Sequence, residues 1–464
     1  MTQATRKTYF AAQALLETGW ARDVAIEVDA EGRIAGLRPD ATSAGAGALK
    51  GPVVAGMPNL HSHAFQRAMA GLTEVALNPE DSFWTWRDLM YRLVGKLDPE
   101  QVEAIARYLY IDMLKGGYTA VAEFHYLHHD RDGRPYADPA EMSRRVLAAA
   151  ERAGIHITLL PVMYAHGGFG GKAPSEGQRR FLHDSDGYLR LLDTLAADCR
   201  KPNRGLGACF HSLRAVTLAE MQRVLAATDD GRPVHVHIAE QQKEVDDCLA
   251  WSNRRPIEWL YDNLAVDARW CLIHATHADP GEVAAMARSR AVVGLCPTTE
   301  ANLGDGIFPA IDFAAAGGVL GIGSDSHVSV SALEELRWLE YGQRLKHEKR
   351  NRLYAPGQKN VAAFLHDACL NGGAQAMNGT APAAARSGAL AVGCRADLVV
   401  LDGQHPLLAH VAGDDILGRW LFAGSDRLVR DVMVGGDWVV QDGRHPDEIE
   451  AGRAFAEAVK AVLG

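Results

Sequence analysis

Apolar runs recur through the middle of the chain and alternate with stretches whose apolar positions repeat at helical spacing. The runs predict buried β-strands at 53–60, 118–124, 156–164, 205–210, 233–239, 270–275, 291–296 and 319–324. The amphipathic stretches between them predict helices, among them 99–115, 140–153, 216–228, 241–250, 280–288 and 332–346. Eight strands alternating with helices over about 320 residues suit a (β/α)8 TIM barrel. Counting strands leaves a doubly wound open sheet as the alternative.

Both ends of the chain show a different pattern, in which short strands surround turns rich in Gly and Asp. These strands are predicted at 7–10, 20–28, 33–38, 396–401, 428–434 and 437–441. We predict that the two ends form one small β-sandwich domain. The predicted boundaries are 1–52 for its N-terminal part, 53–378 for the barrel and 379–464 for its C-terminal part.

A terminal helix and two long loops complete the predicted organisation. The helix covers 447–462, and segments 64–98 and 165–187 exceed ordinary βα loops. Long loops at a barrel mouth often act as lids or bind ligands. The apolar side of the terminal helix is predicted to consist of Ile449, Phe455, Ala458 and Val462.

Composition limits the classes of function. The chain is 47% hydrophobic and 23% charged, as in ordinary globular proteins. A net charge of −10 without a long basic run argues against nucleic acid as a partner. A small anionic substrate still fits, because a few buried arginines can reverse the field locally. No apolar stretch reaches the roughly 18 residues of a membrane span, so we expect no membrane partner.

The cysteines and the N-terminus indicate the compartment. Seven cysteines are widely spaced and contain no Cys-x-x-Cys pair, which is typical of reduced thiols and not of a disulfide framework. The first residues lead into no signal-peptide core. We therefore expect a cytoplasmic protein.

Polar side chains collect where the predicted strands end. The stretch His61-Ser62-His63 follows the first apolar run, and alternation along a strand directs both imidazoles to one face. In a barrel the strand ends meet at one mouth, where active sites lie. The other polar strand ends are 123–126, 209–214, 235–240, 273–277 and 323–327. We predict a single site at this mouth.

These motifs in combination resemble the amidohydrolase superfamily, and within it the mononuclear deaminases. The resemblance is carried by His61-x-His63, His237 with Glu240, His274 and Ser324-Asp325, and by the similar return segment 393–400. No strand-end lysine is placed to bridge two metals, since the fourth strand presents Cys209 and His211. One divalent metal ion is therefore expected.

The chemistry of these residue types agrees with the resemblance. Three imidazoles and one carboxylate, from His61, His63, His237 and Asp325, are ligands suited to zinc, although iron or manganese would also fit. Zinc lowers the pKa of a bound water from 15.7 toward about 7. Asp325 could also take the proton of that water, and Glu240 could carry it to a departing nitrogen. His274 could hydrogen-bond the attacking oxygen.

Four further stretches narrow the resemblance to the N-formimidoyl-L-glutamate deiminases of bacterial histidine breakdown. These stretches are 59–68, 83–91, 123–129 and 211–216. The resemblance implies hydrolysis of the formimidoyl C=N bond by a metal-bound hydroxide, which yields N-formyl-L-glutamate and ammonia. It also implies a homodimer. The groups available for the two substrate carboxylates are Gln66, Arg87, Tyr126, His211 and Arg214.

Neighbouring residues have more ordinary interpretations. We expect His235 to pack beneath His237, and His277 and His327 to lie in loops. Three histidines are expected in a polar loop: His125, His128 and His129. Four aromatic side chains either pack the first long loop onto the barrel or line a pocket: Phe83, Trp84, Trp86 and Tyr91.

Three rival functions stay open at this point. The chain could deaminate another small amidine or guanidine, or hydrolyse a heterocycle. It could be a metal-binding ligand sensor on the same fold, although such a sensor would not need both Glu240 and Asp325. It could also be a scaffold with core histidines, which would hold no stoichiometric metal.

Overall fold

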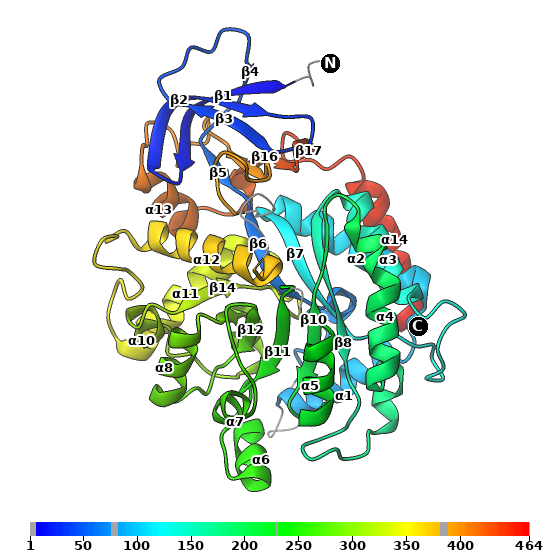
Figure 1. Cartoon of the computed structure of the whole chain (residues 1–464). Helices are drawn as coiled ribbons and strands as arrows, with labels where there is room; N and C mark the ends of the chain where they lie inside the picture. Colours follow the sequence, from blue (N-terminus) through cyan, green and yellow to red (C-terminus); the bar gives the residue numbers. More distant parts are fainter. Residues whose placement is uncertain (1–5, 76–81, 229–230, 381–387, 464) are drawn as a thin grey trace.

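The computed structural model describes residues 6–75, 82–228, 231–380 and 388–463 (Figure 1). Parallel strands follow one another in the order β14-β13-β12-β11-β10-β8-β7-β6. A parallel bridge between Ser62 and Asp325 joins the two edge strands of this sheet. The predicted (β/α)8 barrel is confirmed, and the doubly wound open sheet is wrong.

The barrel strands lie close to the predicted runs. Their bounds are β6 (Met57–Ser62), β7 (Tyr118–His125), β8 (His156–Met163), β10 (Ala208–Ser212), β11 (Val234–Ile238), β12 (Trp270–His274), β13 (Val292–Leu295) and β14 (Val319–Ile322). The run at 205–210 is divided, because β9 (Arg204–Leu206) and β10 pair with different parts of β8.

The run predicted as one strand at 53–60 is two strands. β5 (Val53–Ala55) belongs to the sheet of the chain ends, and β6 begins after Gly56. A Cβ at Gly56 would lie 2.1 Å from the Thr119 side chain, so a larger residue would not fit at this crossing. The apolar run is therefore continuous although its two halves serve different sheets.

The helices surround the barrel, and each predicted one is present within two residues at either end. Their starts are set locally: Asp98 accepts a hydrogen bond from Gln101 N–H, and Pro99 opens the helix. The bounds are α1 (Phe83–Val94), α2 (Pro99–Lys115), α3 (Glu141–Ala153), α4 (Ser185–Ala196), α5 (Leu218–Ala227), α6 (Gln242–Ser252), α7 (Pro256–Asn263), α8 (Pro280–Ser289), α9 (Pro297–Leu303), α10 (Ala310–Ala315), α11 (Ala332–His347), α12 (Val361–Asn378), α13 (Asp414–Ala423) and α14 (Glu448–Leu463).

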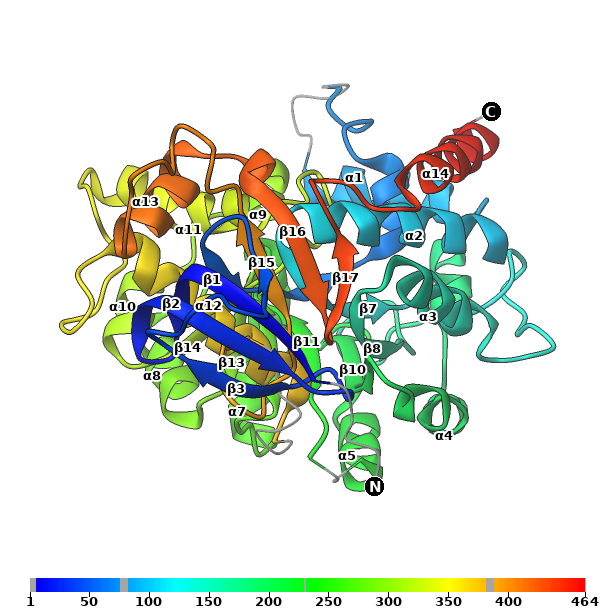
Figure 2. The ribbon, with the colours of Figure 1, turned by 90° about the horizontal axis from the view of Figure 1, so that it is seen from above.

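The two chain ends share one sheet beside the barrel, which forms the predicted small sandwich. The order is β17-β16-β15-β5-β1-β2-β3, and β4 pairs with β1. Seen from above, the N-terminal strands lie next to the C-terminal ones (Figure 2). The bounds are β1 (Lys7–Leu16), β2 (Gly19–Val28), β3 (Ile34–Arg38), β4 (Gly47–Ala48), β15 (Leu398–Leu401), β16 (Val429–Val434) and β17 (Asp437–Val440). The exact domain boundaries stay predictions, and residues 1–5, 381–387 and 464 of the two sandwich parts lie outside the described residues.

Helix α14 packs on α2, but its apolar side differs from the prediction at one position. Phe455 stacks on Tyr108 of α2 with ring centroids 4.4 Å apart, and Ala458 and Val462 are buried. Ile449 is 64% exposed, so its predicted place on the buried side is wrong. The buried side follows the spacing of Phe455, Ala458 and Val462, and Ile449 lies off this stripe.

The long loops are tied to one another through Arg180, which lies in the 165–187 segment and is 1% exposed. Its guanidinium donates to the carbonyls of His129 and Leu97 at 2.9 Å, and also to that of Val94. One side chain therefore joins three loops above the barrel. Residues 76–81 of the segment 64–98 lie outside the described residues.

Replacing Arg180 by Met should destabilise these loops, because it leaves the buried carbonyls of His129 and Leu97 without their donor and removes one of two donors to that of Val94. We expect a loss of about 2–4 kcal/mol, since each unpaired buried polar group costs about 1–3 kcal/mol and water can partly compensate. Thermal unfolding and limited proteolysis measure this change. Arg179→Met is the matched control, because Arg179 is partly exposed and bonds to other carbonyls. Equal melting temperatures of the two variants would contradict the prediction.

No helix among the described residues is long and apolar enough to cross a lipid bilayer.

Candidate active site

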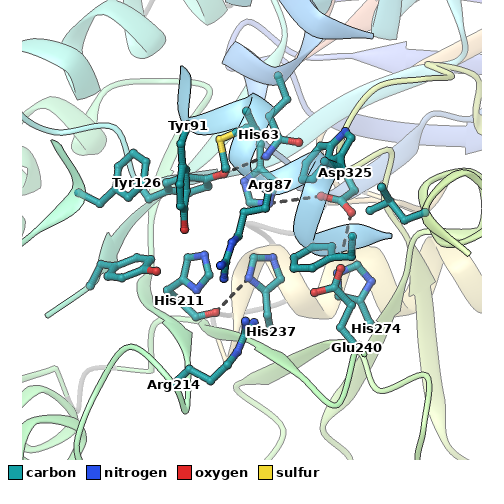
Figure 3. Close-up of a pocket in the computed structure, with 17 residues that line it drawn as sticks. His63, Arg87, Tyr91, Tyr126, His211, Arg214, His237, Glu240, His274 and Asp325 are labelled. Carbon is teal, nitrogen blue, oxygen red and sulfur yellow. Dashed lines mark hydrogen bonds and ion pairs between the residues drawn. The ribbon is translucent and has the colours of Figure 1, made fainter. Parts of the chain in front are cut away.

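The carboxyl ends of the barrel strands converge on a pocket (Figure 3). His61 lies beneath this pocket and is fully buried. The other predicted site residues all line the pocket: His63, Gln66, Arg87, Tyr126, His211, Arg214, His237, Glu240, His274 and Asp325. The fold thus brings together side chains that are spread over more than half of the sequence.

The four residues predicted as metal ligands turn their polar atoms toward one another. Nε2 of His61 lies 2.9 Å from Nε2 of His237 and 3.4 Å from Oδ1 of Asp325. Nε2 of His63 lies 3.3 Å from the same carboxylate oxygen. All four side chains are buried, so solvent does not satisfy these atoms.

In each of two imidazoles, a backbone carbonyl determines which ring nitrogen carries the proton and which keeps a free lone pair. Nδ1 of His63 donates to the carbonyl of Phe124 at 2.8 Å, and Nδ1 of His237 donates to that of His211 at 3.0 Å. Nε2 of each ring therefore keeps its lone pair. Burial lowers the pKa of these two histidines, and it lowers that of His61 to about 3, so the rings are neutral. Neutral imidazoles facing one carboxylate fit a divalent cation.

A thiol that the sequence did not indicate lies beside this group. Ligand atoms of His274, Cys296 and Asp325 lie within 4.8 Å of one another. Burial raises the pKa of the Cys296 thiol well above its usual range.

Glu240 and His274 occupy the side of the pocket next to Asp325. Nε2 of His274 lies 3.8 Å from Oε1 of Glu240 and 3.8 Å from Oδ2 of Asp325. Burial raises the pKa of Glu240 to about 7, close to that of a proton shuttle working near neutral pH. Burial lowers the pKa of His274, but the surrounding carboxylates outweigh it and raise the pKa to about 10. The pair therefore combines a carboxyl that can exchange a proton with a cationic imidazole.

The backbone is strained where these side chains leave their strands. His274 has φ of 72° and Asp325 has φ of 48°, and Ala239 and Ala275 are also left-handed. Such conformations cost a non-glycine residue about 1–3 kcal/mol and are enriched at active sites. The turns aim the side chains into the pocket at the expense of backbone stability.

Two arginines form the opposite side of the pocket. The guanidinium carbon of Arg87 lies 4.6 Å from the ring centre of Trp84, and that of Arg214 lies 5.6 Å from the same ring. Arg214 is also 3.9 Å from the fully buried carboxylate of Glu244. Three of the four aromatic residues of α1 line the pocket, Phe83, Trp86 and Tyr91, whereas Trp84 does not.

Three further predicted residues lie between the two sides. Nε2 of Gln66 donates to the hydroxyl of Tyr126 at 2.9 Å, while Oε1 of Gln66 is buried without a partner. His211 lies with its ring centroid 5.5 Å from that of Tyr126. Burial keeps the pKa of His211 well below its usual range, so its ring is neutral. These groups offer hydrogen bonds without adding charge.

The histidines expected outside the site are placed partly as predicted. His235 packs in the barrel core and donates to the carbonyl of Ala376 at 2.8 Å. His128 and His129 lie in the predicted loop but are buried there, whereas His125 is the last residue of β7, so its predicted place in the loop is wrong. His128 and His129 bond to backbone carbonyls of neighbouring segments, which explains their burial. His277 and His327 lie in loops, but His327 is fully buried.

A buried network supports the turn that carries His61 and His63. Glu123 accepts hydrogen bonds from Ser62 Oγ at 2.5 Å and from the Ala64 N–H at 2.7 Å. Ser62 Oγ also lies 3.1 Å from Nε2 of His327. Ser62 can make these bonds because alternation along the strand turns it away from its two neighbours.

The sequence did not indicate two residues of the site, one that lines the pocket and one that lies behind it. Tyr164 lines the pocket at the end of β8, and its hydroxyl accepts a 2.6 Å hydrogen bond from Gln178. Glu300 lies behind His274, 3.3 Å from its Nδ1. The available signal was position, because Tyr164 ends the predicted strand 156–164 and Glu300 follows the predicted strand 291–296.

Comparison with known proteins agrees with this geometry. The profile of the amidohydrolase family matches residues 53–439, which is most of the chain. The chain therefore belongs to the amidohydrolase family. A second profile, for the N-terminal domain of the formimidoylglutamate deiminase HutF, matches residues 7–51.

Individual relatives narrow the comparison. The chain is 65% identical to a formimidoylglutamate deiminase of Pseudomonas aeruginosa over 454 residues, 98% of this chain and 99% of the relative. It is 27% identical to an 8-oxoguanine deaminase of the same species, over 84% of this chain and 82% of the relative. A crystal structure of an amidohydrolase from Brucella melitensis is 48% identical and superposes with a TM-score of 0.92, covering 99% of this chain and 100% of that one.

Proposed function

We infer that the protein is a formimidoylglutamate deiminase, a hydrolase of the C–N bonds of linear amidines in histidine breakdown. It converts N-formimidoyl-L-glutamate and water into N-formyl-L-glutamate and ammonia. The observation that carries this inference is the division of charge in the pocket, with Arg87 and Arg214 on one side and Glu240 and Asp325 on the other. The substrate has the complementary division, with two carboxylates at one end and a basic amidine at the other. The 65% identical relative supports the same reaction.

We propose that His61, His63, His237 and Asp325 hold one divalent metal ion, most simply zinc. The support is their converging buried lone pairs and the absence of a lysine among them. Such an ion, when bound, lowers the pKa of a coordinated water toward about 7.

The chain's own groups then handle the protons. Asp325 accepts a proton from the attacking water, and Glu240, with its pKa of about 7, passes a proton to the nitrogen that leaves as ammonia. Cationic His274 donates a hydrogen bond from Nε2 to the attacking oxygen and orients it toward the formimidoyl carbon, while the electron pair of the C=N bond moves to nitrogen, which Glu240 protonates.

The remaining predicted residues orient the substrate. Arg87 and Arg214 bind the two carboxylates, because a guanidinium donates a pair of parallel hydrogen bonds to a carboxylate. Tyr126, Gln66 and neutral His211 supply hydrogen bonds nearer the amidine. Binding energy gained at the carboxylates is remote from the reacting carbon and serves to align it.

Ammonia release from N-formimidoyl-L-glutamate tests the function directly. We expect turnover by the purified protein, complete loss after removal of the metal with a chelator, and recovery on adding zinc. Elemental analysis should give one metal per chain. A panel of other amidines, guanidines and heterocycles is the comparison, and faster turnover of any of them would favour a different deaminase. A metal-loaded protein that binds the substrate without releasing ammonia would instead be a sensor.

Assembly and location stay predictions of the same proposal. We propose a homodimer, which light scattering after size-exclusion chromatography tests, and a cytoplasmic location, which fractionation of the source cells tests.

A further inference from the structure

We propose that Glu300 is a positioning residue for His274, holding the imidazole so that Nε2 faces the reacting groups. This inference rests on the proposed function, because it assigns His274 a hydrogen bond to the attacking oxygen. Glu300 does not line the pocket and lies on the far side of the ring. It therefore acts through His274 and not on the substrate.

The geometry places the ring between two sets of carboxylates. Oε1 of Glu300 lies 3.3 Å from Nδ1 of His274. The opposite nitrogen, Nε2, lies 3.8 Å from both Glu240 and Asp325. Oε1 also accepts a hydrogen bond from the N–H of Cys296, so it is an acceptor, and Nδ1 carries a proton and donates it in the hydrogen bond. A half-turn of the ring about its bond to Cβ would exchange the positions of its nitrogen and carbon atoms. The contact with Glu300 selects the orientation in which Nδ1 faces the carboxylate.

Glu300 is itself held in place by a hydrogen bond to its carboxylate and by the anchoring of its helix. The same Oε1 accepts a 2.9 Å hydrogen bond from the N–H of Cys296, directly before α9. The start of α9 is fixed by Thr298, whose N–H donates to buried Glu335 of α11 at 3.0 Å. A carboxylate anchored in this way has a defined position relative to the ring.

His274 needs such a partner because its own backbone does not define the ring direction. Its φ of 72° departs from strand geometry at the last residue of β12. The ring stacks on that of His237, with centroids 5.5 Å apart and planes inclined by 19°. Stacking fixes the plane of the ring but does not distinguish its two nitrogens. The contact with Glu300 supplies that distinction.

The test is a series of substitutions at Glu300 in the metal-loaded full-length protein. Glu300→Gln keeps an oxygen that can accept from both His274 and Cys296, and should retain kcat within about threefold. Glu300→Leu removes the acceptor and should lower kcat about 10- to 100-fold, the usual effect of losing a partner behind a catalytic group. KM and metal content should stay unchanged in both, because the arginine side and the metal ligands are not touched.

Glu340→Gln is the matched control for stability. Glu340 is fully buried and accepts hydrogen bonds from the N–H groups of Arg352 and Leu353, far from the pocket. We expect it to lower the melting temperature without changing kcat. If Glu300→Leu does not fold, Glu300→Asp replaces it, since the shorter carboxylate withdraws from the ring, and its kcat should fall at unchanged KM.

Several results would overturn the assignment. One is a kcat of Glu300→Leu within threefold of wild type, and another is an equal loss of kcat in Glu300→Gln and Glu300→Leu. A parallel rise in KM would mean that the pocket had collapsed, which also contradicts a pure positioning role. Wild-type protein that releases no ammonia would defeat the proposed function itself, before any variant is measured.

Discussion

Glu240→Gln is expected to abolish nearly all turnover while the metal stays bound. The amide has the shape of the carboxyl group but cannot accept and release a proton, and general acid–base groups contribute about 10²- to 10⁴-fold to rates. We therefore expect kcat to fall by about that factor, with KM nearly unchanged. Steady-state measurement of ammonia release gives kcat and KM, and elemental analysis gives the metal content.

Glu176→Gln serves as the control for this variant, because the Glu176 side chain is 85% exposed in the 165–187 loop. It should be indistinguishable from wild type. Wild-type rates in Glu240→Gln would remove Glu240 from the reaction. A loss of metal together with activity would place Glu240 among the groups that hold the ion, contrary to the proposed shuttle role.

Arg214→Met should raise KM for formimidoylglutamate steeply. Leaving one substrate carboxylate without its buried cation costs about 2–5 kcal/mol, which corresponds to a factor of about 30 or more in binding. We expect kcat to change less than KM, because a carboxylate bound by Arg214 is remote from the reacting carbon of the substrate. Steady-state kinetics separates the two parameters.

The partner of Arg214 provides the control. Glu244 is fully buried 3.9 Å from the guanidinium, so removing Arg214 alone leaves an unpaired buried carboxylate and lowers stability. The double variant Arg214→Met with Glu244→Gln should recover stability but keep the high KM. If stability falls in Arg214→Met and KM does not rise, Arg214 is structural. Arg214→Met should weaken binding of a formimidoyl amino acid with only one carboxylate less than it weakens binding of the natural dicarboxylate. This holds for the analogue that lacks the carboxylate bound by Arg214.

The position of the site at the barrel mouth could be predicted because it depends on local rules. Alternation along a strand puts His61 and His63 on one face, and a barrel brings strand ends to one mouth whatever the details of packing. The starts of helices such as α2 follow from Asp98, Pro99 and Gln101, which act within one turn. These features were correct because no distant residue is needed to decide them.

Other features depended on neighbours that are distant in sequence. The division of the first apolar run at Gly56 reflects the close approach of Thr119, and the exposure of Ile449 reflects which stripe of α14 meets α2. The burial of His128 comes from its bond to the carbonyl of Val162, on another strand. Hydrophobicity alone assigns a residue to the core or the surface but does not say which partner it meets.

The sequence by itself determined the barrel, the small domain built from both ends, and the residue types gathered at the mouth. Only the tertiary structure decided how these residues face one another: the 2.9 Å approach of His61 to His237, the two arginines beside Trp84, and Glu300 behind His274. The reason is physical. Periodicity is a property of neighbouring residues in the chain, whereas pKa values, tautomers and charge separation arise from side chains that meet only after folding.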